Sequence, residues 1–131
     1  MSQIVTIPHV NDRRGNLGFV ELGAPIDFSI KRVYYLYDVP GGAERGAHAH
    51  RELQQLIVAV SGSFEVELYD GFTRRSFHLN RAYEGLLVRP GSWRELRNFS
   101  SGAVCLVLAS MEYDESDYIR DINEFERFVR Q

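Results

Sequence analysis

The feature that most constrains the fold is a series of short apolar or alternating segments, separated along the chain by turn-forming residues. Alternation places apolar side chains on one face of a strand, so each segment is typical of a short, half-buried strand. Asp70-Gly71, between two such segments, predicts a tight hairpin. Many short strands at this spacing predict an all-β jelly-roll barrel. The expected strands cover residues 4–8, 16–21, 29–37, 54–61, 64–69, 74–79, 85–89, 94–98 and 103–110.

The end of the chain has a different period. Apolar residues at positions 118, 122, 125 and 128 follow helical spacing, and Ser116 or Asp117 precedes them where a cap would stand. We expect a short amphipathic helix there, packed on the barrel or across a subunit contact. A length of 131 residues suits one domain with one core, so the predicted domain covers residues 1–131.

Charge and composition exclude several functions. A net charge of −3 and a pI near 5.8 do not suit a nucleic-acid surface or an anionic membrane. No apolar run approaches the length of a membrane span, and the N-terminus does not resemble a secretory signal. Cys105 is a lone cysteine in an apolar run, which predicts a buried free thiol and fits a reducing compartment. We expect a cytoplasmic protein.

His48-Ala49-His50 is the motif that carries chemistry. It follows a glycine-rich turn, and residues two apart in a strand share a face, so we expect both imidazoles to point into the barrel. Two imidazoles on one face are typical of a metal site or of an acid–base pair.

The spacing of Gly42, His48, His50 and Gly62 resembles the first motif of the cupin superfamily, with Gln54 at the position of its glutamate. Residues 90–98 are similar to the second motif, with Arg94 in place of its histidine. An amide is a poor ligand for a divalent cation, and a guanidinium cannot ligate one. We therefore expect no metal, and we expect Arg94 to be a partner for an anion or oxyanion.

Longer motifs resemble one family of cupins, the WxcM-like nucleotide-sugar 3,4-ketoisomerases. The similarity extends from about residue 12 to residue 125, and it is carried by residues 29–35, 45–50, 93, 98–101, 107–110 and 113–120. This resemblance implies a metal-free homodimer that exchanges N-terminal strands. It also implies a dTDP-4-keto-6-deoxyglucose substrate and a role in dideoxyaminosugar synthesis for surface polysaccharides such as O-antigen.

The chemistry of such an isomerase fits these residue types. Moving a ketone from C4 to C3 needs a base near neutral pKa, which histidine supplies, and hydrogen-bonding or cationic partners for an enediolate. We expect no cofactor, because the adjacent carbonyl already acidifies the C3 proton. By the resemblance, His50 matches the position of the base and His48 that of its helper. Trp93 is equally suited to stacking on the thymine base and to the core. The expected substrate-binding residues are Arg14 (in an Asp-x-Arg-Gly turn), Arg32, Tyr34, Arg45, Arg94 and Trp93.

Two other functions remain compatible with the sequence. The same proton abstraction would serve a keto-sugar nucleotide epimerase, and a cupin could also bind a sugar without turnover. The pair of histidines favours catalysis, because recognition of a neutral sugar rarely needs two adjacent bases. For a ketoisomerase, both configurations at C4 of the product, gluco and galacto, are compatible with these residues.

Overall fold

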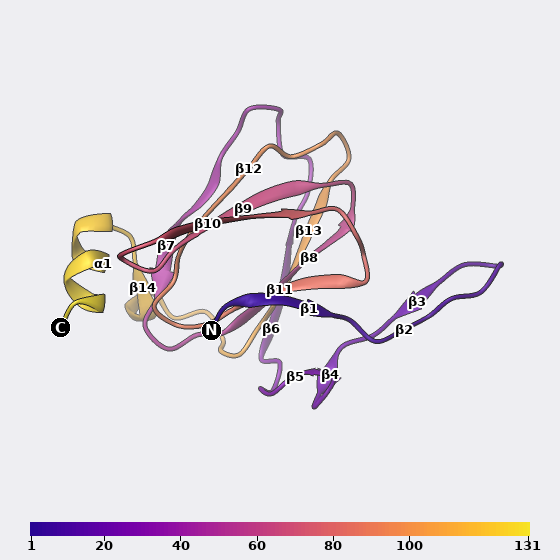
Figure 1. Ribbon diagram of the computed structural model, residues 1–131, viewed down its shortest axis with the longest axis horizontal. Coiled ribbons are helices and arrows are strands. Elements are labelled where there is room, and N and C mark those ends of the chain that lie inside the picture. Colours follow the sequence, from indigo (N-terminus) through magenta and orange to yellow (C-terminus); the bar gives the residue numbers. More distant parts are fainter.

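The computed structural model describes residues 1–131, and its centre is a pair of five-stranded sheets that face each other (Figure 1). The first sheet has the order β1-β11-β8-β13-β6 and the second the order β10-β9-β12-β7-β14, with hydrogen-bonded neighbours antiparallel throughout. The expected all-β jelly-roll architecture with a short C-terminal helix is confirmed. The first sheet contains β1 (Gln3–Thr6), β6 (Arg32–Leu36), β8 (Gln55–Ser61), β11 (Glu84–Val88) and β13 (Val104–Ala109). The second contains β7 (Arg45–His50), β9 (Phe64–Tyr69), β10 (Arg74–Leu79), β12 (Trp93–Arg97) and β14 (Tyr118–Ile119).

The main core lies between the two sheets. Alternate residues of facing strands meet there, among them Ile57 of β8, Val66 of β9 and Val107 of β13, all at most 2% exposed. Removing each such side chain from water stabilises the fold by about 1.5–3 kcal/mol. Cys105 belongs to this core, as predicted, and burial raises the pKa of its thiol to about 12. The predicted hairpin at Asp70-Gly71 joins β9 to β10.

The C-terminal helix covers the outer face of the second sheet. Helix α1 (Ile122–Val129) starts at its N-cap Asp121, whose side chain accepts a hydrogen bond from the backbone N–H of Asn123. The helix therefore begins later than the expected position after Ser116 or Asp117. Residues 115–117 form a 3-10 turn, η1 (Glu115–Asp117), and Tyr118 and Ile119 pair with β7 as a strand instead. No helix in the structure has the length and hydropathy of a transmembrane segment.

A hairpin arm extends from the body at the end opposite α1 (Figure 1). It consists of β2 (His9–Val10) and β3 (Leu17–Gly18), which pair only with each other. A second small pair, β4 (Glu21–Leu22) and β5 (Pro25–Ile26), leads from the arm back to the first sheet. Apolar side chains on the arm are exposed, including Val10 at 57% and Leu17 at 59%.

Candidate active site

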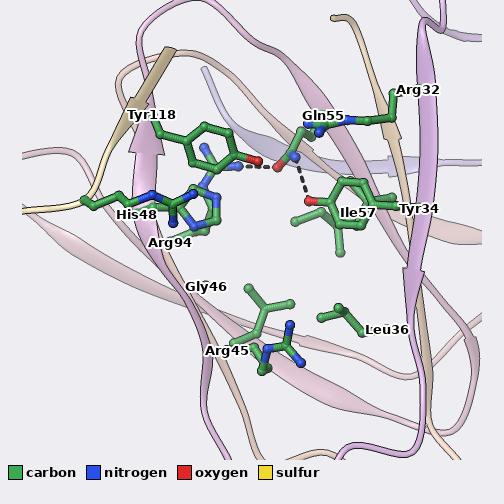
Figure 2. Close-up of a pocket in the computed structure, with 13 residues that line it drawn as sticks. Arg32, Tyr34, Leu36, Arg45, Gly46, His48, Gln55, Ile57, Arg94 and Tyr118 are labelled. Carbon is green, nitrogen blue, oxygen red and sulfur yellow. Dashed lines mark hydrogen bonds between the residues drawn. The ribbon is translucent and has the colours of Figure 1, made fainter. Parts of the chain in front are cut away.

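A pocket of about 320 Å³ opens between the two sheets. Side chains from β6, β8 and β13 form one wall, and side chains from β7, β12 and β14 form the other (Figure 2). Its apolar lining includes Ile57, Leu96 and Val107, which belong to the main core. The pocket is lined by Arg32, Tyr34, Leu36, Arg45, Gly46, His48, Gln55, Ile57, Arg94, Leu96, Val107, Tyr118 and Arg120.

A bulge in β7 places His48 in the pocket wall. On β12, Arg94 pairs with His48 and the next residue, Glu95, pairs with Gly46, so Ala47 is an extra residue without a partner. Ala47 has a φ of 56°, in the left-handed region, which costs a residue with a Cβ about 1–2 kcal/mol. Such strain near a pocket is typical of a functional constraint.

The two histidines of the motif lie together, but only one of them reaches the pocket. The ring centroids of His48 and His50 are 4.9 Å apart, and the rings are nearly perpendicular. His48 borders the pocket, and its Nε2 is buried without a protein partner. His50 is fully buried behind it and does not border the pocket. Because only His48 reaches the pocket, the geometry favours His48 rather than His50 as the base.

Asp117 orients His50 through a buried hydrogen bond. Nδ1 of His50 donates to Oδ2 of Asp117 at 3.0 Å, and Asp117 also accepts the backbone N–H groups of Glu52 (2.8 Å) and Leu53 (3.3 Å). A carboxylate with three donors around it acts as an acceptor, so the proton of the neutral imidazole is on Nδ1. Nε2 of His50 is then the unprotonated nitrogen.

Burial and positive charge keep both imidazoles neutral. Burial, and next the guanidinium of Arg94, lower the pKa of His48 to about 4, although the backbone of Gly46 opposes this shift. The pKa of His50 is lowered by the same two causes. At neutral pH, therefore, His48 presents an imidazole that can accept a proton.

Arg94 is the most deeply buried charge in the pocket, at 2% exposed. Burial lowers its pKa only to about 10, so the guanidinium remains charged. Its Nη1 donates to Oε1 of Gln55, and its Nη2 donates to the carbonyl of Ser92 at 3.0 Å. Nε2 of Gln55 in turn donates to the hydroxyl of Tyr34 at 2.9 Å (Figure 2).

Several buried polar atoms have no protein partner, and three of the residues that carry them line this pocket. The atoms are Nε and Nη2 of Arg32, Nε of Arg94 and Nε2 of His48. Buried polar atoms without partners are rare in folded proteins, and each carries a desolvation cost. Three guanidinium donors and one imidazole acceptor in one pocket suit a ligand with several oxygens and an acidic C–H or O–H group.

Five predicted residues lie where the sequence analysis expected them: Arg32, Tyr34, Arg45, His48 and Arg94 all line the pocket. The structure does not bring Trp93 there. Trp93 and Arg94 are consecutive in β12, so they point to opposite faces of the sheet. Trp93 packs under α1 with the ring of Phe125, at a centroid distance of 5.8 Å.

Arg14 also lies outside the pocket of its own chain. It stands in the loop of the arm, its side chain is 85% exposed, and it forms a two-point ion pair with Asp12. Gln54, the residue at the cupin glutamate position, is likewise outside the pocket, where its side chain contacts Arg89.

Sequence reasoning missed four residues of the site. Gln55, Tyr118 and Arg120 line the pocket, and Asp117 orients His50. The signal for Gln55 was the alternation of β8, because Gln55 shares a face with Ile57, which is part of the core. No comparable signal marked Asp117, whose partner is distant in the sequence.

Known proteins resemble this chain over nearly its whole length. The family model FdtA, described as WxcM-like, C-terminal, matches residues 1–130. A curated relative from Aneurinibacillus thermoaerophilus, TDP-4-oxo-6-deoxy-alpha-D-glucose-3,4-oxoisomerase, is 41% identical over 128 residues. The match covers 98% of this chain and 92% of that protein.

Solved structures share the fold closely. The 3,4-ketoisomerase from Helicobacter canadensis has 47% sequence identity and a TM-score of 0.94, covering 99% of this chain and 98% of that one. A histidine-to-asparagine variant of the 3,4-ketoisomerase QdtA from Thermoanaerobacterium thermosaccharolyticum, in complex with TDP-4-keto-6-deoxyglucose, has 34% identity and a TM-score of 0.96. That comparison covers 98% of this chain and 94% of QdtA.

Proposed function

We propose, since this chain belongs to the FdtA family of WxcM-like C-terminal proteins, that it is a sugar nucleotide 3,4-ketoisomerase. Its substrate is TDP-4-keto-6-deoxyglucose, and its product is the corresponding TDP-3-keto-6-deoxyhexose. The observation that carries this proposal is the neutral His48, whose unpartnered Nε2 borders a pocket that also contains the guanidiniums of Arg32 and Arg94.

The reaction moves two protons and no net electrons. The C4 ketone acidifies the C3 proton, a base removes that proton, and the electron pair forms a C3–C4 double bond with negative charge on the C4 oxygen. The proton of the C3 hydroxyl then passes to the C4 oxygen, and C4 is protonated as the C3 ketone forms. The step needs a base, a proton donor and stabilisation of an oxyanion, and the pocket residues supply groups of all three types.

We assign the removal of the C3 proton to His48. His50 is a positioning residue, because it contacts the ring of His48 edge-on and is itself held by Asp117. Arg32, Arg45 and Arg94 supply positive charge for the enediolate and the diphosphate. The reaction requires no metal or organic cofactor, because the adjacent carbonyl already activates the C3 proton.

The chain acts as a homodimer that exchanges its N-terminal arms. An apolar groove of about 350 Å³ lies on the outer face of the first sheet, lined by residues such as Phe19, Val58 and Leu106. The exposed apolar residues of the arm of one copy pack on this groove of the second copy. The exchange would also carry Arg14, which is remote from its own pocket, toward the pocket of the partner. Sedimentation velocity tests the dimer, and a monomer at micromolar concentration would contradict it.

Proton NMR of the chain incubated with TDP-4-keto-6-deoxyglucose in D2O tests the activity. We expect a 3-keto product with deuterium at C4. An epimerase would instead retain the 4-keto group and invert a neighbouring carbon, and a binding module would leave the sugar unchanged. The TDP-3-keto product fits a later amination in dideoxyaminosugar synthesis, and we expect the enzyme to work in the cytoplasm.

Two variants separate the roles of the histidines. His48→Asn should lower kcat by several orders of magnitude, because it removes the base, whereas His50→Asn should lower kcat by a smaller factor. Circular dichroism controls for folding. A His48→Asn variant with near-normal turnover would contradict the assignment of the base.

A further inference from the structure

A chain of three hydrogen-bonded side chains crosses the pocket from one sheet to the other. Arg94 of β12 donates to Oε1 of Gln55 in β8, and Nε2 of Gln55 donates to the hydroxyl of Tyr34 in β6 (Figure 2). All three residues line the pocket, and Arg94 and Gln55 are almost fully buried. Figure 2 places Tyr34 on the wall opposite His48.

The direction of this chain follows from the chemistry of its groups. A guanidinium has donors only, so the amide oxygen of Gln55 must face Arg94. The amide N–H2 of Gln55 must then face Tyr34, whose oxygen accepts the bond. The proton of the Tyr34 hydroxyl therefore points away from Gln55. No other side-chain or backbone group of the chain accepts it, and the hydroxyl borders the pocket.

We infer that Gln55 is a positioning residue that makes Tyr34 a hydrogen-bond donor to the enediolate oxygen of the substrate. This inference rests on the proposed ketoisomerase function and adds the orientation of the donor to it. Burial raises the pKa of Tyr34, so its hydroxyl keeps the proton that it donates. A donor fixed before the substrate binds needs no reorganisation when charge develops on that oxygen.

An amide is suited to this position in a way that a carboxylate is not. A glutamate at position 55 would accept from Arg94 and from Tyr34 at once, because an ionised carboxylate has acceptors only. The Tyr34 proton would then point toward residue 55, and the pocket would lose the donor. Gln55→Glu is nearly isosteric and leaves Arg94 with a partner, so it reverses one hydrogen bond without leaving a buried cation unpaired.

The experiment measures kcat and KM for TDP-4-keto-6-deoxyglucose in the wild type, Gln55→Glu, Tyr34→Phe and the double variant. We expect Gln55→Glu and Tyr34→Phe each to lower kcat by about 10²–10³-fold with KM little changed, as for loss of an oxyanion donor. In the double variant we expect no further loss beyond that of Gln55→Glu alone. A matched control is Gln54→Glu, which also places a carboxylate beside an arginine, Arg89, but outside the pocket. It should retain wild-type kcat.

The other outcomes contradict either this inference or the proposed function. Wild-type kcat in Gln55→Glu overturns the inference, and so does a full additional loss from Tyr34→Phe in the Gln55→Glu background. The latter would show that Gln55→Glu acts through the charge of Arg94 and not through Tyr34. If Gln55→Glu does not fold, Tyr34→Phe alone decides, and a normal kcat overturns the inference. A wild-type chain without turnover refutes the proposed function itself.

Discussion

Asp117 accepts three hydrogen bonds in a buried position, and its replacement by asparagine tests how the histidine pair is held. Oδ1 accepts the N–H of Glu52, and Oδ2 accepts both Nδ1 of His50 and the N–H of Leu53. Asparagine has one carbonyl oxygen, so its N–H2 group must face at least one of these donors. A lost hydrogen bond to a charged acceptor costs about 1.5–3 kcal/mol, and those that remain become weaker.

Asp117→Asn should therefore lower the free energy of unfolding by about 2–4 kcal/mol, measured by urea denaturation. It should also lower kcat about 10–100-fold, because His50 no longer holds the ring of His48 in one position. Asp121→Asn is the matched control, since Asp121 is the N-cap of α1 and asparagine caps equally well. A free energy of unfolding for Asp117→Asn within about 0.5 kcal/mol of the wild-type value, as expected for a surface substitution, would refute the reasoning.

Three further predictions concern the bulge, the pH dependence and the tryptophan. The pKa of His48 is about 4 in the folded chain and 6.5 in the unfolded chain, so only the unfolded chain takes up this proton between those values. Lowering the pH from 7 to 5 should thus cost about 2 kcal/mol of stability from this residue, and an equal loss in His48→Asn would contradict this. Ala47→Val should lower stability by roughly 1–2 kcal/mol and reduce kcat, whereas Ala47→Gly should be tolerated, since only glycine adopts the left-handed region freely. Equal behaviour of the two variants in denaturation and turnover would argue against strain at the bulge. Trp93→Phe should lower the melting temperature with KM unchanged, because Trp93 belongs to a buried cluster. A raised KM would indicate instead that Trp93 contacts the substrate.

The sequence was sufficient for the fold and for the proximity of the two histidines, because both depend on local alternation. Period-two patterns predicted the strands, and the same rule put His48 and His50 together. It could also have excluded Trp93, because a residue next to Arg94 in a strand faces away from it. The cupin motif instead indicated Gln54, although the side chain that faces the pocket is that of the neighbouring Gln55.

The residues that escaped prediction depend on contacts between distant segments. Asp117 lies 67 positions from His50, and its place in the sequence predicts a helix cap instead. Tyr118 has helical spacing with the apolar residues of α1, yet it pairs with His50 as a strand. Asp117 accepts hydrogen bonds from buried groups and does not cap the helix, whose N-cap is Asp121. Local sequence preferences carry no information on such contacts between distant segments.

The apolar layer between the sheets also forms part of the pocket lining, through Ile57, Leu96 and Val107. Its thickness sets the separation between the wall that carries His48 and the wall that carries Tyr34. A change of one methylene group in that layer would alter this separation without touching the substrate. Thermal adaptation through tighter packing and the evolution of turnover are therefore coupled in this architecture, because mutations in the same few aliphatic residues change both.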